Sequence, residues 1–259
     1  MLTKKELNYY SSLLKKKYRS EEKIFLAEGK KIVEEGITNP FWIKNLEIVF
    51  ATNEFMEKEN NWVQIILYKN VNTGKIRIIK NSELKKLSDT LNPQGITAVF
   101  NMASAEQAAS ENELVCLENI SDPGNVGTII RNCDWFGINE VILGEGCADI
   151  YNPKTIRASA GSIFHLKFYN EANLIKFLLS LKSSGYKIIT ADLKGKNIYS
   201  FARPEQFALI FSNEANGPSN EILGISDEIV AVPKKGNAES LNVSSASAVI
   251  LSELLRSMN

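Results

Sequence analysis

At 259 residues, 44% of them hydrophobic, the chain is long enough for one large domain or two ordinary ones with a packed core. No apolar run approaches the roughly 20 residues of a membrane-spanning helix, and the basic N-terminal segment lacks the apolar core of a signal peptide. The three cysteines form no C-x-x-C pair, which argues against a disulfide framework and against structural zinc. We therefore expect a cytoplasmic protein that is not bound to a membrane.

The formal net charge of zero conceals an asymmetry along the chain. Residues 1–100 carry 17 Lys/Arg against 12 Asp/Glu, whereas residues 101–259 carry 13 against 18. The most basic piece contains Lys15, Lys16, Lys17 and Arg19. Taken alone, such a run is more often the solvated face of a helix. The basic excess of this half slightly favours the alternative, a strip that contacts phosphate groups.

The single histidine, His165, limits the possible chemistry. Sites that need several histidines for a metal are excluded, and Ser-His-Asp or Cys-His catalysis has one candidate base. His165 lies in an alternating apolar run that predicts a strand, where a histidine is more often packed or hydrogen-bonded than catalytic. We therefore expect no histidine catalysis and no metal site built from several histidines.

In chain order, the first hundred residues predict short helices that alternate with short strands. Apolar periodicity predicts helices over residues 3–17 and 28–35, the second ended by Gly36. Strand-length apolar runs occupy residues 24–27, 46–51, 64–67 and 96–100. The following residues are small, polar and aperiodic. We therefore expect an N-terminal domain over 1–101, a linker over 102–113 and a second domain over 114–259.

In the second domain, strands and helices alternate regularly. The predicted strands occupy residues 114–118, 140–143, 163–169, 186–191, 207–211 and 228–232. The predicted helices occupy residues 126–136, 171–183 and 242–256. This alternation predicts an α/β fold with a mostly parallel sheet covered on both faces. Ligands of such sheets bind at the carboxyl ends of strands, so the loops there are candidate sites.

The first of three polar strand-end loops begins at Asn119 and leads to Arg131. Pro123-Gly124 forces a tight turn directly after the strand. Asn125 can then cap a helix whose free amides favour an anionic ligand. Alternatively, the loop is only a turn with a cap, and Arg131 is only a surface charge. Composition alone favours this second interpretation.

The second loop, 212–218, places Glu214 between asparagines and a glycine, so it could bind a cationic or hydroxyl-rich ligand or simply turn the chain. The third loop, 232–246, contains Ser240, a plausible N-cap, and leads into a helix rich in Ser and Ala that a ligand could approach closely. The sequence contains no G-x-G-x-x-G after a strand, no G-x-x-x-x-G-K-S/T and no G-x-S-x-G elbow. Ordinary dinucleotide binding, phosphate-loop and serine-hydrolase chemistry are therefore unsupported.

Together the three loops resemble the motifs of the SpoU (TrmH) family of RNA 2′-O-ribose methyltransferases in the SPOUT superfamily. The first resembles N-x-x-D/N-P-x-N-x-G-x-x-x-R and is matched by Asn119, Asp122, Pro123, Asn125, Gly127 and Arg131. The second resembles G-x-E-x-x-G, with Ser212 in place of the first glycine. The third resembles I-P followed by S-L-N-V-S-x-A, with Val232 in place of isoleucine. All three occur in order over residues 114–257.

Upstream, Arg19, Phe25, Glu28 and Gly29 resemble more loosely the family's small N-terminal substrate-binding domain, which is itself similar to RNA-binding ribosomal proteins. The resemblance implies a small N-terminal α/β RNA-binding domain followed by an α/β-knot domain, whose C-terminal segment threads a loop as a trefoil knot. It also implies a homodimer with active sites near the subunit interface. We expect RNA contacts at Lys15, Lys16, Lys17 and Arg19.

The resemblance further implies S-adenosylmethionine as the cofactor, held largely by backbone groups, and no metal. The residues at the family's cofactor positions are Thr190, Ser212, Asn213, Gly217, Val232 and Leu241. The implied reaction is in-line attack of a ribose 2′-oxygen on the sulfonium methyl.

Arg131 matches the family's proposed base, and Asn125, Glu214, Ser240 and Asn242 match the positions that orient Arg131, the ribose and the cofactor. Because a guanidinium is essentially always protonated, two roles stay open for Arg131. It shares a proton with an RNA phosphate, or it only positions the phosphate and stabilises developing charge.

Three other functions compete with this one. A knotted methyltransferase acting on a base atom is disfavoured by residues 119–131, because base-modifying relatives carry different motifs. A catalytically weak or inactive RNA-binding protein with the knotted fold would be expected to lose Arg131, Glu214 or Asn242, and all three are present. A hydrolase or reductase lacks the expected loops. We expect a structured RNA as the substrate, with ribosomal RNA ahead of transfer RNA.

Overall fold

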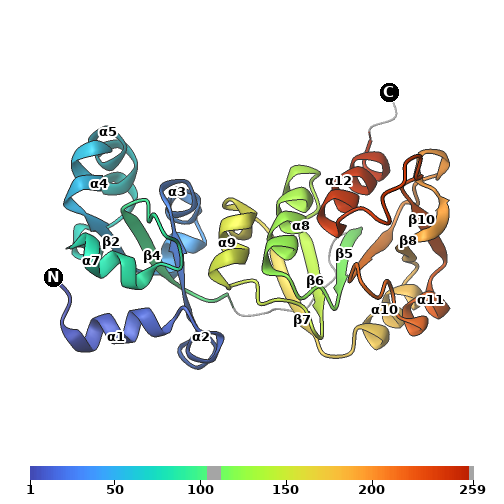
Figure 1. Ribbon diagram of the computed structural model, residues 1–259, viewed down its shortest axis with the longest axis horizontal. Helices are drawn as coiled ribbons and strands as arrows, with labels where there is room; N and C mark the ends of the chain where they lie inside the picture. Colours follow the sequence, from blue (N-terminus) through green and yellow to red (C-terminus); the bar gives the residue numbers. More distant parts are fainter. Residues whose placement is uncertain (104–111, 257–259) are drawn as a thin grey trace. The chain divides into compact units, whose positions relative to one another are not determined.

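The computed structural model describes residues 1–103 and 112–256, which form two compact units (Figure 1). One unit comprises Met1–Ser104 together with Asp149–Phe164, and the other comprises Ala105–Ala148 together with His165–Asn259. The segment Asp149–Phe164 thus interrupts the second unit in sequence but packs with the first. The prediction of two contiguous domains did not include this exchange. Most of the predicted linker lies outside the described residues.

The first unit contains a four-stranded sheet of order β1-β4-β2-β3. Its strands are β1 (Ile24–Glu28), β2 (Leu46–Thr52), β3 (Ile76–Ile79) and β4 (Ile96–Asn101). β4 runs antiparallel to β1 and β2, whereas β2 and β3 are parallel. The α-helices around it are α1 (Lys4–Ser12), α2 (Lys16–Glu22), α3 (Lys30–Thr38), α4 (Asn53–Lys58), α5 (Asn60–Trp62), α6 (Tyr68–Asn70), α7 (Asn81–Leu84) and α9 (Pro153–Ser159).

Three predictions for this unit are wrong. The helix predicted over 3–17 is two helices, because Lys15 is extended and begins α2. The strand predicted over 64–67 is a helical turn, Val63–Leu67, and a short apolar run does not distinguish a buried strand from a buried helix. Gly36 lies inside α3 rather than ending it, and a Cβ added there would lie 2.5 Å from Cζ of Phe100. That glycine permits close packing.

An aromatic cluster holds the segment Asp149–Phe164 in the first unit. The ring centroids of Phe25 and Tyr151 lie 4.5 Å apart, and Phe164 lies 5.2 Å from Phe100 and 5.3 Å from Trp42. Such pairs contribute energy beyond the burial of their area. The neighbouring α9 was not predicted from the sequence, although Asn152 caps it and Pro153 begins it.

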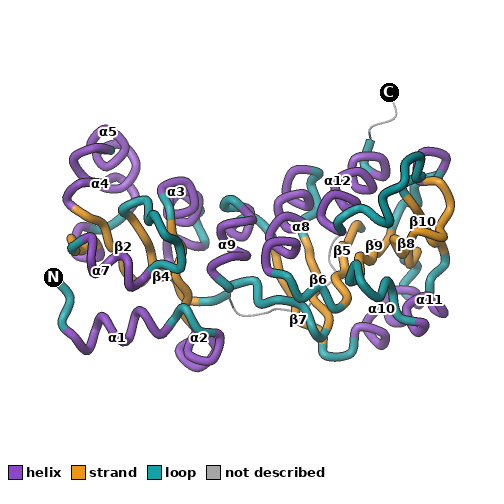
Figure 2. Tube along the Cα trace, in the orientation of Figure 1, coloured by secondary structure: helices purple, strands orange, loops and turns teal. Residues whose placement is uncertain are grey.

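The second unit contains a six-stranded sheet of order β10-β8-β9-β5-β6-β7 (Figure 2). Every neighbouring pair of strands is parallel. Its strands are β5 (Glu113–Glu118), β6 (Glu140–Gly144), β7 (Lys167–Glu171), β8 (Lys187–Asn197), β9 (Phe207–Ser212) and β10 (Glu228–Ala231). Its helices are α8 (Pro123–Trp135), α10 (Leu174–Ser183), α11 (Asn220–Ile225) and α12 (Val243–Leu254). The predicted α/β fold with a mostly parallel sheet is confirmed. The trefoil knot stays a prediction.

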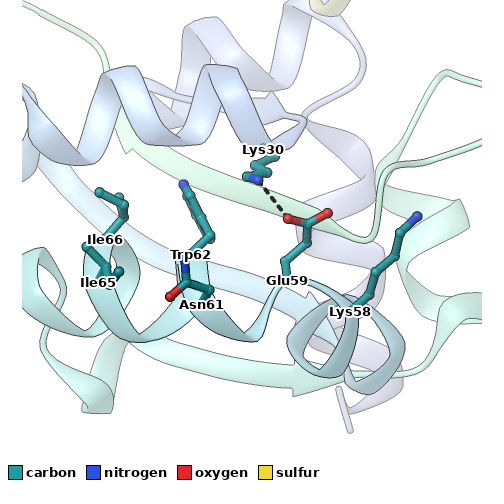
Figure 3. A pocket seen from close by; sticks show the side chains of 7 residues that line it. All are labelled: Lys30, Lys58, Glu59, Asn61, Trp62, Ile65 and Ile66. Atoms are coloured by element: carbon teal, nitrogen blue, oxygen red, sulfur yellow. Dashed lines mark hydrogen bonds and ion pairs between the residues drawn. The ribbon is translucent and has the colours of Figure 1, made fainter.

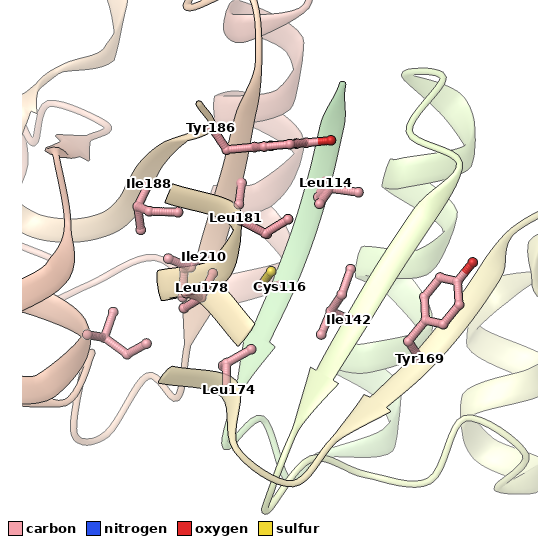
Figure 4. Packing of buried hydrophobic residues seen from close by; sticks show 12 residues of the cluster. Leu114, Cys116, Ile142, Tyr169, Leu174, Leu178, Leu181, Tyr186, Ile188 and Ile210 are labelled. Atoms are coloured by element: carbon pink, nitrogen blue, oxygen red, sulfur yellow. The ribbon is translucent and has the colours of Figure 1, made fainter. Parts of the chain in front are cut away.

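Both faces of this sheet are covered. On one face, alternate strand residues such as Cys116, Ile142 and Ile210 pack beneath α10 and α11 (Figure 4). Residues of the opposite parity, such as Val115 and Leu209, are also fully buried. α8 and α12 pack against each other, and Figure 1 shows them across the sheet from α10 and α11.

The order of the strands determines where a site can form. From β5 the chain moves outward through β6 and β7, and β9 and β8 lie on the other side of β5. Glu118 at the end of β5 pairs with Ser212 at the end of β9. Open parallel sheets bind ligands at such a reversal of strand order. The loops that follow these two strands therefore begin side by side.

Candidate active site

The three motif loops meet through a polar cluster formed by Asn125, Glu214 and Asn242. Nδ2 of Asn125 donates to Oε1 of Glu214 at 2.5 Å, across 89 residues of sequence. Nδ2 of Asn242 donates to Oδ1 of Asn125 at 3.0 Å and to Oε1 of Glu214 at 3.4 Å. The backbone N–H of Val243 also donates to Glu214, at 3.4 Å. The structure thus joins one residue of each motif, and the partners of Glu214 are neutral amides.

Helix capping positions two of these side chains, though not as predicted. Asp122, rather than Asn125, caps α8 by accepting from the backbone N–H of Asn125 at 3.0 Å. Asn242, rather than Ser240, caps α12 by accepting from the backbone N–H of Ser244 at 2.9 Å. Because Asn125 is not the cap, its Oδ1 is available to accept from Asn242, while its Nδ2 donates to Glu214.

A second set of bonds joins the first two loops around Glu118. Its Oε2 accepts from Oγ of Ser212 at 2.7 Å and from the backbone N–H of Ser219 at 3.2 Å. Nδ2 of Asn213 donates to the carbonyl of Asn119 at 3.2 Å. Ser212, which stands where the family has glycine, thus directs its hydroxyl to Glu118.

Arg131 lies outside the polar cluster. It is exposed on α8, and its guanidinium makes no hydrogen bond or ion pair with any residue that the structure describes. Its spacing of six residues from Asn125 places the two side chains on different faces of the helix. Trp135, one turn further on, is 82% exposed and shares the face of Arg131.

A cavity of about 540 Å³ lies beside the polar cluster, a size typical of small-molecule sites. The predicted residues that line it are Ser212, Asn213, Glu214, Gly217, Val232, Ser240 and Leu241. Thr190 does not line it, because its side chain is fully buried and its Oγ1 lies 2.7 Å from Oγ of Ser226. We predicted Thr190 among the residues that hold the cofactor largely through backbone groups, and this contact stays a prediction.

The sequence analysis missed part of the cavity wall. Asp192, Leu193 and Lys194 of β8 line it, although they belong to none of the three motifs. The cavity is lined by apolar side chains, which include Phe211 and Ile250, and also by carboxylates. This composition fits a ligand that has both an apolar ring and hydrogen-bond donors.

The predicted RNA-contacting residues differ in exposure. Lys15, Lys16 and Lys17 are exposed, so their contact with RNA stays a prediction. Arg19 is 1% exposed, and its guanidinium donates to Oδ2 of Asp149 at 2.7 Å and to the carbonyl of Leu13 at 2.8 Å. The prediction that Arg19 contacts RNA is therefore wrong, since its donors are used inside the first unit.

The first unit has a smaller hollow of about 310 Å³ (Figure 3). Lys30 at its edge pairs with Glu59 at 2.6 Å, and the indole N–H of Trp62 donates to Glu34 at 2.7 Å. These polar groups are already satisfied within the unit. Within residues 1–103 and 112–256, no group of three or more His, Cys, Asp or Glu could hold a metal ion, and no helix is long and apolar enough to cross a bilayer.

Comparison with known proteins assigns the family. Residues 112–252 match the model of the SpoU rRNA methylase family, and residues 4–98 match the MRM3-like substrate binding domain. The chain is 33% identical, over 95% of its length and 94% of the relative's, to the 23S rRNA (guanosine(2553)-2′-O)-methyltransferase RlmP of Bacillus subtilis.

Solved structures share the fold. A TrmH-family protein from Porphyromonas gingivalis has a TM-score of 0.85 and 30% identity, with 98% of each chain covered. The SpoU methyltransferase AviRb from Streptomyces viridochromogenes, in complex with AdoMet, has a TM-score of 0.83 at 23% identity, with 98% of each chain covered. The chain therefore belongs to the SpoU rRNA methylase family.

Proposed function

We propose that the chain transfers the methyl group of S-adenosylmethionine to a ribose 2′-hydroxyl of ribosomal RNA. Family membership makes it an S-adenosylmethionine-dependent RNA methyltransferase. The ribose position and the ribosomal substrate are supported by RlmP, whose name specifies 2′-O-methylation of 23S rRNA. The observation that carries the proposal is the polar cluster of Asn125, Glu214 and Asn242 beside the cavity.

The cavity residues fit this cofactor, which supplies a methyl group on a positively charged sulfur. Glu214 lines the cavity and accepts hydrogen bonds only from neutral amides of the described chain, so its negative charge favours a cation there. Asn125 and Asn242 fix the orientation of that carboxylate. Ser212, Asn213, Gly217, Val232 and Leu241 would hold the cofactor.

Arg131 is assigned the role of holding RNA rather than that of a base. Guanidinium groups in general are poor bases, and that of Arg131 has no partner among the described residues that would compete with a phosphate. A phosphate held there places the neighbouring ribose at the site, and the positive charge stabilises the developing alkoxide. The exposed Lys15, Lys16 and Lys17 add phosphate contacts from the substrate-binding domain.

The proposal includes a cytoplasmic homodimer. Trp135 is 82% exposed on the helix that carries Arg131, and a second copy of the chain would cover this apolar side chain. Arg131 would then lie at the edge of the interface. Sedimentation of the wild type and of Trp135→Glu tests this assembly, and identical masses for the two proteins would contradict it.

Mapping of 2′-O-methyl sites in total RNA from cells with and without the gene tests the reaction. We expect one 2′-O-methyl group of ribosomal RNA to disappear and to return with the wild-type gene but not with Arg131→Ala. Loss of a base methylation would contradict the ribose assignment, and an unchanged map would support a non-catalytic RNA-binding protein. Loss from transfer RNA alone would contradict the ribosomal substrate.

A further inference from the structure

Strand β8 does not pair continuously with β10. Ile229 of β10 pairs with Thr190 of β8, whereas the next residue, Val230, pairs with Lys196. The residues between them, 191–195, therefore leave the ladder, and we refer to them as the β8 bulge. Bulges of this kind redirect side chains and occur often beside active sites.

Close packing fixes the end of the β8 bulge. A Cβ added to Gly195 would lie 2.5 Å from the carbonyl carbon of Val230, so only glycine lets the two backbones approach this closely. Within the bulge, Oδ1 of Asp192 accepts from the backbone N–H of Lys194 at 2.8 Å. The approach of Gly195 to β10 and the hydrogen bond of Asp192 thus both hold the bulge in place.

The β8 bulge presents two contrasting side chains to the cavity. Leu193 is 63% exposed and lines the same cavity as Leu241, which is 47% exposed, so a ligand between them would cover apolar surface. Oδ2 of Asp192 lies 3.5 Å from the position that a Cβ of Gly217 would take. One oxygen of this carboxylate is bonded within the bulge, and the other lies beside a glycine in the cavity wall.

We infer that Asp192 accepts a hydrogen bond from the ribose hydroxyls of the cofactor's adenosyl group, while Leu193 packs against the adenine. In dinucleotide-binding folds, an acidic side chain about 20 residues after the glycine-rich turn accepts from a ribose hydroxyl, so a carboxylate is a suitable acceptor for this group. Leu193 supplies the apolar contact that an aromatic base requires. The inference rests on the proposed function in one respect, that the cavity binds S-adenosylmethionine.

Calorimetry on the full chain tests this inference with two ligands. S-adenosylhomocysteine carries both the adenosyl group and an amino acid, whereas methylthioadenosine keeps the adenosyl group and lacks the amino acid. We expect Asp192→Asn to weaken both ligands to a similar extent, between about tenfold and a hundredfold, the range for a hydrogen bond to a charged group. The asparagine keeps an oxygen for the N–H of Lys194, so thermal unfolding without ligand should be unchanged.

Glu228→Gln is the matched control. Glu228 pairs with Lys196 at 2.6 Å next to the β8 bulge but does not line the cavity, so removal of its charge should leave both affinities within twofold of the wild type. Leu193→Ser is a second test, and it should also weaken both ligands equally.

Two results would overturn the inference. One is that Asp192→Asn binds both ligands within twofold of the wild type. The other is that it weakens S-adenosylhomocysteine but not methylthioadenosine, which would place the carboxylate at the amino group instead. If the wild type binds neither ligand, the proposed function itself fails, and this result is distinct from the other two.

Discussion

Arg19 in the first unit and Arg131 in the second show two opposite uses of one side chain. The guanidinium of Arg19 is buried and bonded to Asp149 and to the carbonyl of Leu13. The guanidinium of Arg131 is exposed and makes no hydrogen bond or ion pair with the described residues. A buried, paired guanidinium contributes to folding, whereas an unpaired one is available to a ligand. The hydrogen-bond and ion-pair partners of a basic residue in a motif therefore indicate whether it contributes to folding or is available to a ligand.

The largest effect is expected when the buried ion pair between Arg19 and Asp149 is broken. Arg19→Ala leaves the mostly buried carboxylate of Asp149 without its cation, and we expect a loss of about 3–5 kcal/mol in the free energy of unfolding. Chemical denaturation measures it. Lys17→Ala on the same helix is the control, because Lys17 is exposed and should change stability by less than about 0.5 kcal/mol. Equal stability of the two variants would show that Arg19 is not structural.

The second prediction concerns the unpaired arginine. Arg131→Ala should lower the rate of methyl transfer by about a hundredfold to a thousandfold, the usual loss when one group that stabilises transition-state charge is removed. Its melting temperature and its affinity for S-adenosylhomocysteine should match the wild type, because Arg131 does not line the cavity. A rate within threefold of the wild type would contradict the role.

A smaller effect is expected for the exposed lysines that precede Arg19. Replacement of Lys15, Lys16 and Lys17 by alanine should weaken RNA binding without loss of stability. The slope of log affinity against log salt should fall by about 0.7–0.9 for each RNA phosphate that the variant no longer neutralises. Filter binding at several salt concentrations measures the slope. An unchanged slope would assign these lysines to the solvated face of a helix.

The smallest effects concern Ser212. They distinguish a serine that only stabilises the fold through Glu118 from one that obstructs the cofactor. Its hydroxyl bonds to Glu118, so Ser212→Ala should cost about 1 kcal/mol in unfolding free energy. Ser212→Gly restores the residue usual in the family, and we expect it to bind S-adenosylhomocysteine within twofold of the wild type. A tenfold gain in affinity for the glycine variant would show that the serine obstructs the cofactor.

Much of the second unit could be predicted from the sequence, because its strands are strongly apolar and its loops carry recognisable motifs. The family resemblance implied a shared role for Asn125 and Glu214, but it did not predict the caps at Asp122 and Asn242. Asp192 could not be predicted, since its place in the cavity depends on a shift of register between β8 and β10. The burial of Arg19 could not be predicted from the sequence either, because its partner Asp149 lies 130 residues away.

The packing of Asp149–Phe164 with the first unit has a consequence for biosynthesis. A ribosome that has made the N-terminal sheet has not yet made the residues that complete its aromatic cluster, because β5, α8 and β6 are translated in between. Domains generally fold as units during synthesis, N-terminal first, but here that unit is finished only after part of the second has emerged. A fragment that stops before Asp149 lacks Tyr151 and Phe164, the ring partners of Phe25 and Trp42, so the first unit is complete only after residue 164 has been made.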